Sequence, residues 1–212
     1  RLRSAGVVVI PTIGARRHAE KVAEWGVDAV IAQGAEGGGH TGVVPTSLLI
    51  GEVLDAIDLP VIAAGGFTDG RGLAAALAWG ADAVAMGTRF LLTSDSDVPD
   101  SIKAIYLATP VTGTVVTRAV DGAPQRVVAT PMVERLESAR LFAFPRAARN
   151  ALRFRSLTGT PMRELLAEGL RMKRSGDLTW GQVAMAANAP MLTRATMVDG
   201  HPEVGILPTG QG

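Results

Sequence analysis

Cysteine is absent from this sequence, and its absence removes several classes of function at once. Without a thiol the chain forms no disulfide, offers no thiolate to a metal ion and has no cysteine nucleophile. Aromatic residues are also scarce, at 4% of the chain. No apolar run approaches the roughly 18 residues that a membrane-spanning helix requires. No signal peptide is recognised, so a soluble cytoplasmic protein is the expectation.

Net charge is small as well, because 21 lysine and arginine residues against 20 aspartate and glutamate residues leave a formal charge of +1. This balance gives no reason to expect nucleic acid as a partner, and a small-molecule ligand is the expectation. What the chain does have is apolar material, 47% of its 212 residues, and 25 glycines. Abundant small residues with few aromatics favour tightly packed α/β layers over a β-sandwich.

Strand-like and helix-like segments alternate along the first hundred residues. Short apolar runs predict strands at residues 7–10, 28–32, 60–64 and 83–86. Amphipathic patterns predict helices at residues 15–25, 46–57 and 69–79, the last of them capped by Asp69. Together they predict a parallel sheet that is buried on both faces. An open doubly wound sheet and part of an eight-stranded barrel both satisfy this pattern, and both bind ligands at the carboxyl ends of the strands.

The pattern changes near residue 93, where a polar break precedes a predicted helix at 101–108 and a short strand at 114–117. Residues 1–99 are therefore expected to hold the βα units, and residues 100–212 to form a mainly helical region packed on or over them. An intact barrel usually takes about 250 residues. The βα units here occupy far fewer, and the chain begins at Arg1 directly before a strand-like run. A barrel interpretation requires further strands outside this sequence.

Glycine clusters follow three of the predicted strands. The stretch at residues 33–42 reads QGAEGGGHTG, Gly65-Gly66 follow the third strand, and Met86-Gly87-Thr88 follow the fourth. Paired glycines let backbone N–H groups approach a phosphate closely, and a helix N-terminus adds a favourable partial charge. Thr88 adds a hydroxyl donor. The alternative is that these glycines only form tight turns between strands and helices.

His40 is the candidate acid–base group of the first cluster, because imidazole is the side chain that titrates near neutrality. The alternative is an imidazole with a structural role. Gln33 ends its strand and is a candidate to donate its amide to a cofactor ring, while Glu36 is expected to hydrogen-bond locally and order the loop. His18 and His201 are expected on the surface.

Two segments together closely resemble the nitronate monooxygenase family, formerly called 2-nitropropane dioxygenases. They are AQGAEGGGH at residues 32–40 and PVIAAGGFTDGRGLAAALAWGADAVAMGTRFL at residues 60–91. The likeness is clear over residues 5–120 and weaker afterwards, although GILPTGQG at residues 205–212 resembles the family's C-terminus. The family comprises FMN-dependent TIM-barrel flavoenzymes, and FMN-dependent enoyl-thioester reductases are its relatives. Gly37 stands where the family usually has alanine in its Glu-Ala-Gly-Gly-His motif.

The resemblance implies a site and an architecture. FMN would be held by Gln33, Gly38, Gly39, Gly65, Gly66, Met86, Gly87 and Thr88. His40 matches the family's active-site histidine, which would transfer a proton or stabilise an oxyanion in the oxidation of a nitronate. No metal ligand set is implied. The strands at residues 7–86 would be the last four of a TIM barrel, and the first four are expected to exist outside this sequence.

One further feature bears on the substrate. Arg146, Arg149 and Arg153 share one face of a predicted helix and could bind the phosphates of coenzyme A; the alternative is a solvated basic face. These arginines leave a second function as an alternative. It is an FMN-dependent reductase that takes electrons from NADH or NADPH and acts on an acyl-CoA or enoyl thioester in lipid or steroid breakdown. A flavin-free lyase or isomerase with a phosphate ligand and a non-catalytic binding fragment are the remaining alternatives. A homodimer is the candidate assembly.

Overall fold

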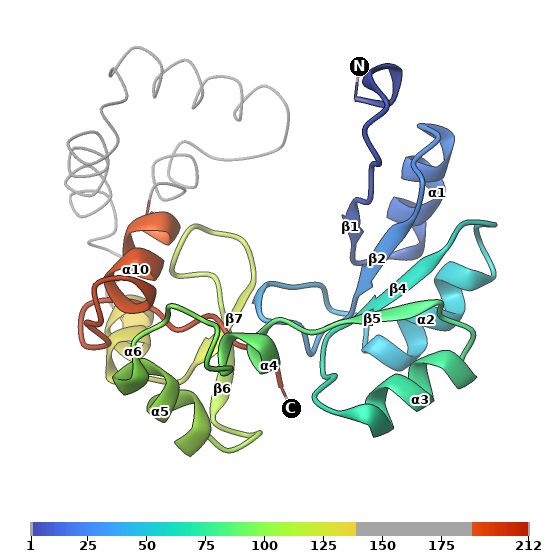
Figure 1. The fold of residues 1–212 in the computed structure, drawn as a ribbon. Helices are drawn as coiled ribbons and strands as arrows, with labels where there is room; N and C mark the ends of the chain where they lie inside the picture. The colour runs from blue at the N-terminus through green and yellow to red at the C-terminus, as the bar shows by residue number, and fades with distance from the viewer. Residues whose placement is uncertain (1, 139–187, 212) are drawn as a thin grey trace, which may run out of the picture. The chain divides into compact units, whose positions relative to one another are not determined.

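The computed structural model describes residues 2–138 and 188–211 (Figure 1). Its internal contacts divide the chain into two compact units, each assembled from separate stretches of sequence. Unit 1 consists of Arg1–Ser96, Thr109–Thr114 and Thr209–Gly212, and unit 2 consists of Asp97–Ala108 and Val115–Pro208. Unit 1 thus includes residues 109–114 and 209–212, which the predicted division into residues 1–99 and 100–212 assigns to the second part.

Unit 1 is built on a sheet of four parallel strands, as the sequence predicts. The strands are β1 (Thr12–Ile13), β2 (Val30–Gln33), β4 (Val61–Ala64) and β5 (Ala83–Ala85). Their order in the sheet, β1-β2-β4-β5, follows the order of the sequence, and every neighbouring pair is parallel. The register places Ile31 beside Ile62 and Ala63 beside Val84.

Three helices connect these strands and cover one face of the sheet (Figure 1). They are α1 (Arg16–Glu24), α2 (Thr46–Leu54) and α3 (Gly70–Ala78), which agree with the predicted helices apart from frayed ends. A doubly wound sheet reverses its strand order and carries helices on both faces, whereas a barrel keeps one direction and one face. The observed order and coverage decide between the two predicted architectures in favour of a barrel segment.

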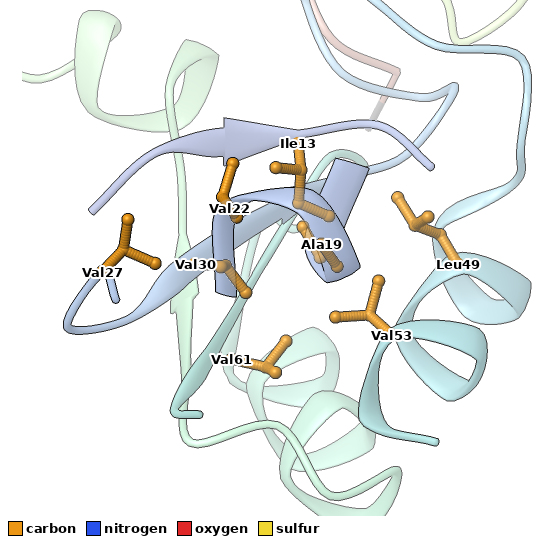
Figure 2. Close-up of a cluster of buried hydrophobic side chains, with 9 residues drawn as sticks. Ile13, Ala19, Val22, Val27, Val30, Leu49, Val53 and Val61 are labelled. Atoms are coloured by element: carbon orange, nitrogen blue, oxygen red, sulfur yellow. The ribbon is translucent and has the colours of Figure 1, made fainter. Parts of the chain in front are cut away.

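The main core of unit 1 lies between the sheet and its helices. Figure 2 shows the cluster, which is formed by Ile13, Ala19, Val22, Val27, Val30, Ala32, Leu49, Val53 and Val61. A second cluster joins Ile50 of α2, Ala63 of β4 and Ala76 of α3. Burying one aliphatic side chain of this size contributes about 1.5–3 kcal/mol, so these contacts fix the helices against the strands and set where the strand ends lie.

The opposite face of the sheet is only partly covered within the described residues. Ile31 and Ile62 alternate with the fully buried Val30 and Val61, and both are half-buried. Successive side chains of a strand point to opposite faces, so residues that alternate with the core point away from the helices. Within the described part of the chain, the predicted burial is thus complete on the helix side and only partial on the opposite face.

The first predicted strand is displaced along the chain. Residues 7–10 are not paired as a strand, and β1 begins only after Pro11, which has no N–H to donate. The N–H of Val9 instead donates to Oδ2 of Asp28 at 2.7 Å, while the carbonyl of Val9 accepts the N–H of Asp28 at 3.0 Å. A side-chain carboxylate thus takes the place of a ladder carbonyl before the strand begins.

Unit 2 contains α5 (Asp100–Ala108), α6 (Pro131–Ser138), α10 (Asn188–Met197), the strand β7 (Gln125–Val128) and all of the neighbouring β6 (Thr114–Thr117) except its first residue. The predicted helix at 101–108 and strand at 114–117 are confirmed, whereas β7 is not predicted by the sequence pattern. The core of the unit is formed by Ala119, Val120, Val127, Val133, Leu136, Leu192 and Ile206. A short 3-10 helix η1 (Arg3–Ala5), β3 (Gly39–His40) and α4 (Thr88–Leu91) complete the elements. Among the described residues, no helix combines the length and apolarity needed to cross a membrane.

Candidate active site

The loop that follows β2 folds back on itself and is fastened near both of its ends. Gln33, the last residue of β2, donates its Nε2 hydrogen to the carbonyl oxygen of His40 at 2.7 Å. The Thr41 hydroxyl lies 3.1 Å from the carbonyl oxygen of Gly34 and 3.2 Å from that of Ala35, so the two oxygens share its single hydrogen. These bonds fix the main chain on either side of His40, which is exposed.

Glu36 fastens the middle of this loop to the start of α2. Its Oε2 atom accepts the backbone N–H of Thr46 at 2.9 Å and the Thr46 hydroxyl at 2.6 Å. The same hydroxyl lies 3.1 Å from the carbonyl oxygen of Gly65, in the turn after β4. The expected local bond of Glu36 is confirmed. Thr46 is a buried contributor that the glycine pattern does not reveal; its only sequence signal is its place at the start of a predicted helix.

Two glycines allow separate backbone segments to meet at the carboxyl edge of the sheet. Gly65 has a φ of +101°, and a Cβ atom there would lie 2.9 Å from the backbone nitrogen of Gly37. A Cβ atom on Gly38 would lie 2.5 Å from the carbonyl carbon of Thr209 and 2.6 Å from the nitrogen of Gly210. Side chains are not tolerated at such distances. Backbone packing therefore requires glycine at both positions, whatever role they have toward a cofactor.

The turn after β5 has a different environment. Gly87 is exposed, and a Cβ atom placed on it would meet nothing within 4 Å. Thr88 begins α4, and its Oγ1 atom accepts the backbone N–H of Gly210 at 3.0 Å. Within the described part of the chain, the backbone N–H groups of Gly66 and Gly87 donate to no protein acceptor. Both N–H groups remain able to bind a ligand.

These loops and turns lie together. The carbonyl oxygen of Ala64, at the end of β4, accepts the N–H of Gly34 at 3.0 Å. A Cβ atom on Gly210 would lie 3.1 Å from the carbonyl oxygen of Glu36, 3.6 Å from the nitrogen of Gly38 and 3.7 Å from Oγ1 of Thr88. The segments after β2, β4 and β5 thus converge at the carboxyl edge of the sheet, where parallel α/β folds bind ligands. The predicted residues in these segments are Gln33, Gly38, Gly39, His40, Gly65, Gly66, Gly87 and Thr88.

A pocket of about 250 Å³ lies beside this edge, between α3 and α4. It is lined by Thr68, Asp69, Gly70, Leu73, Met86, Arg89, Phe90 and Thr93, so Met86 is the predicted site residue that it contains. Asp69 caps α3 as predicted, accepting the N–H of Arg71 at 2.9 Å. The side-chain hydrogen bond from Arg71 keeps the pKa of the Asp69 carboxyl below its ordinary value. Because a carboxylate occupies this helix end, the predicted help of α3 in binding phosphate gains no support from the structure.

The remaining predicted residues lie apart from the edge. His18 is exposed on α1, and His201 is exposed beside Glu203 at 3.4 Å, so both surface predictions are confirmed. Arg146, Arg149 and Arg153 fall outside the described residues, and their role stays a prediction. Within the described ranges, no group of three or more histidine and acidic side chains is placed to hold a metal ion.

The uniform strand order, the helices on one face and the converging turns define a TIM-barrel type of enzyme fold, a fold in which ligands bind at the carboxyl edge of the strands. The chain belongs to the nitronate monooxygenase family, whose sequence profile matches residues 1–212. It is 58% identical over 212 residues to a (3aS,4S,5R,7aS)-5-hydroxy-7a-methyl-1-oxo-octahydro-1H-indene-4-carboxyl-CoA dehydrogenase of Rhodococcus jostii, covering 100% of this chain and 60% of that protein. It is also 36% identical over 146 residues to a "Probable nitronate monooxygenase" of Staphylococcus aureus, covering 64% and 41% of the two chains.

Two solved structures share the fold. FabK from Thermotoga maritima has a TM-score of 0.73 and 34% identity, over 99% of this chain and 55% of that one. A nitroalkane oxidase from Streptomyces ansochromogenes has a TM-score of 0.70 and 29% identity, over 100% of this chain and 53% of that one. The chain therefore spans 60% of the Rhodococcus relative and little more than half of each structure. Its four parallel strands are part of a TIM barrel, as the sequence predicts.

Proposed function

We propose that the intact protein is an FMN-dependent oxidoreductase that acts on the CoA thioester of a fused-ring carboxylic acid. One observation carries the proposal: the loop of the exposed His40 and the turns at Gly65-Gly66 and Gly87-Thr88 lie at the same carboxyl edge. Membership of the family supports the oxidoreductase class. The dehydrogenase that is 58% identical over 212 residues supports the thioester as substrate class.

The donors at this edge suit the phosphate of FMN. The N–H groups of Gly66 and Gly87 and the hydroxyl of Thr88 offer three donors on adjoining turns, and such turns are common anion sites. The carboxylate nearest in the loop, that of Glu36, is already bonded to Thr46. Gln33 uses one amide hydrogen within the loop, which leaves its second hydrogen for a ring atom of the cofactor.

The protein's own part in the reaction would be to position groups and to move a proton. Bound FMN would supply the two-electron acceptor. His40 would take up the proton that leaves the substrate, since imidazole is the common acid–base group in enzymes. The bonds made by Gln33 and Thr41 hold the main chain of His40 in one place, and such positioning lowers the entropic cost of proton transfer.

The test uses the intact natural protein. The purified protein should absorb as a flavoprotein and release FMN on denaturation. Under anaerobic conditions, a hydroxylated indene-carboxyl-CoA thioester should bleach the flavin absorbance, or an unsaturated thioester should reoxidise flavin that NADH or NADPH has reduced. A colourless protein that takes up no added FMN would contradict the proposal, and phosphate binding without flavin binding would instead favour a lyase or isomerase.

Oxidation of a nitronate is the second candidate. The family profile over residues 1–212 and the likeness to the nitroalkane oxidase structure, with a TM-score of 0.70, favour it. In its protonated form, the same imidazole would stabilise the negative charge on the nitronate oxygens. Turnover of a nitronate with oxygen, together with no flavin response to any CoA thioester, would select this activity. Flavin oxidation or reduction by the thioester alone would exclude a dedicated nitronate enzyme.

A further inference from the structure

The segment Thr209–Gln211, which we name the strap, joins two parts of the candidate site that are distant in sequence. The N–H of Gly210 donates to Oγ1 of Thr88 at 3.0 Å, across 122 residues. The N–H of Gln211 donates to the carbonyl oxygen of Glu36 at 2.9 Å. Thr209 is buried, with 4% of its surface exposed. The strap is thus bonded to the turn after β5 and to the loop after β2 at once.

The strap makes these bonds through main-chain atoms, and its backbone lies directly against the glycine loop. The carbonyl carbon of Thr209 and the nitrogen of Gly210 occupy the space that a side chain at position 38 would need, at 2.5 and 2.6 Å. A Cβ atom on Gly66 would lie 3.5 Å from the carbonyl oxygen of Gln211. The strap therefore touches all three segments that form the carboxyl-edge site.

The bond from Gly210 determines what the Thr88 hydroxyl can do. A hydroxyl has one hydrogen and two lone pairs. At Thr88, one lone pair receives the N–H of Gly210, so the hydroxyl hydrogen must point elsewhere. Among the described residues, this hydroxyl donates to no protein acceptor. The bond to the strap thus leaves the Thr88 hydrogen available to a ligand, and the neighbouring Gly87 offers open space, because a Cβ atom there would meet nothing within 4 Å.

We infer that the strap is a positioning element of the cofactor site, in which Gly210 orients the Thr88 hydroxyl to donate to the FMN phosphate. The inference rests on the proposed function, because it requires FMN as the ligand. Gly210 acts through Thr88 and is a positioning residue, whereas Thr88 binds the phosphate itself. Hydrogen bonds to charged groups are stronger than neutral ones, so misorienting this donor should weaken cofactor binding measurably.

The test is a double-mutant cycle on the intact protein, with the FMN dissociation constant measured by quenching of flavin fluorescence. Thr88→Val should weaken FMN binding by about tenfold, and Thr88→Ser, which keeps the oxygen and its hydrogen, should restore binding to within about twofold. Gly210→Pro removes the N–H donor and should weaken binding by about fivefold in the natural background. In the Thr88→Val background the same change should have an effect of less than about twofold, because the group that it orients is gone.

Equal effects of Gly210→Pro in both backgrounds would overturn the inference, because they would show a general structural role. Gly210→Ala is the second variant if the proline variant fails to fold: it keeps the N–H but places a Cβ atom 3.1 Å from the carbonyl oxygen of Glu36. It should show the same dependence on Thr88. Glu203→Ala, exposed on the same C-terminal stretch, is the control and should leave FMN affinity unchanged. Failure of the natural protein to bind FMN would overturn the proposed function itself, so the two failures are distinct.

Discussion

The main chain of His40 is held from both sides by polar side chains of its own loop. Gln33 donates to the carbonyl oxygen of His40, and Thr41 donates to the carbonyls at residues 34 and 35. A fixed main chain suits an acid–base group, because the group must be positioned precisely in order to exchange protons with a substrate.

Replacing His40 with asparagine should therefore separate cofactor binding from chemistry. His40→Asn keeps a polar side chain but cannot transfer a proton, so flavin binding should be retained while the rate of flavin reduction by substrate falls by about 10²–10⁴-fold. Anaerobic stopped-flow absorbance measures that rate. His18→Asn, on the exposed face of α1, is the matched control and should leave it unchanged. An unaltered rate in His40→Asn would show that this imidazole is structural.

At the scale of elements, the site depends on hydrogen bonds that connect a strand end, a loop and the start of a helix. The Thr46 side chain makes such a connection, because its hydroxyl lies within hydrogen-bond distance of Glu36 in the β2 loop and of the carbonyl oxygen of Gly65 after β4. Its buried position means that no water replaces a lost partner easily. A substitution at the start of α2 should therefore destabilise both the loop after β2 and the turn after β4.

Thr46→Val tests the contribution of this hydroxyl with almost no change in side-chain volume. The variant leaves Glu36 Oε2 with the backbone N–H alone and should lose about 1–3 kcal/mol of unfolding free energy in urea denaturation. Thr46→Ser keeps the hydroxyl and should lose much less. If the valine and serine variants unfold at the same urea concentration, the hydroxyl contributes nothing to stability, and other contacts connect α2 to the two loops.

The elements of unit 1 are largely predictable because local residues mark their ends. Asp69 caps α3 and Gly80, with a φ of +100°, ends it, so the pattern and the structure agree there. The first strand is misplaced because Pro11 and the Asp28 carboxylate alter the ladder locally, an effect that apolar periodicity does not contain. Strand β7 is missed because the run Gln125–Val128 begins with two polar residues.

The contacts that connect distant segments of the candidate site are much less predictable than the helices and strands. Glycine clusters and a histidine at strand ends indicate where the site lies. They do not indicate that Thr46 or Gly210 completes it, because those contacts join residues 10 and 122 positions apart through one hydroxyl or one backbone N–H. A threonine or glycine of this kind has no distinctive sequence context. Such contacts become visible only when the fold brings the segments together.

At the scale of the whole molecule, the C-terminal stretch belongs to both units. Residues up to Pro208 group with unit 2, and Thr209 onward group with unit 1. Within unit 2, the Tyr106 hydroxyl donates to the carbonyl oxygen of Pro208 at 2.8 Å, across 102 residues. Tyr106 is the chain's only tyrosine and is almost fully buried, with 6% of its surface exposed. This bond fixes α5 to Pro208, the last residue of unit 2.

The burial of Tyr106 predicts how the stability of the molecule depends on pH. Burial raises the pKa of its phenol well above the ordinary value of 10.0. The folded state therefore keeps the phenol protonated at pH values where the unfolded state ionises, so its contribution to stability is full below about pH 10 and is lost as pH rises further. Unfolding free energies measured by urea denaturation should decline more steeply above about pH 10 in the natural protein than in Tyr106→Phe.

The phenylalanine variant also isolates the hydrogen bond from the titration. Near neutral pH, Tyr106→Phe should lose only about 1 kcal/mol, the cost of leaving the Pro208 carbonyl without its phenol donor. The difference between the two proteins should then shrink as pH rises, because only the natural protein has a phenol that ionises on unfolding. A difference that stays constant up to about pH 11 would mean that the phenol titrates alike in both states, and that its burial is not maintained in solution.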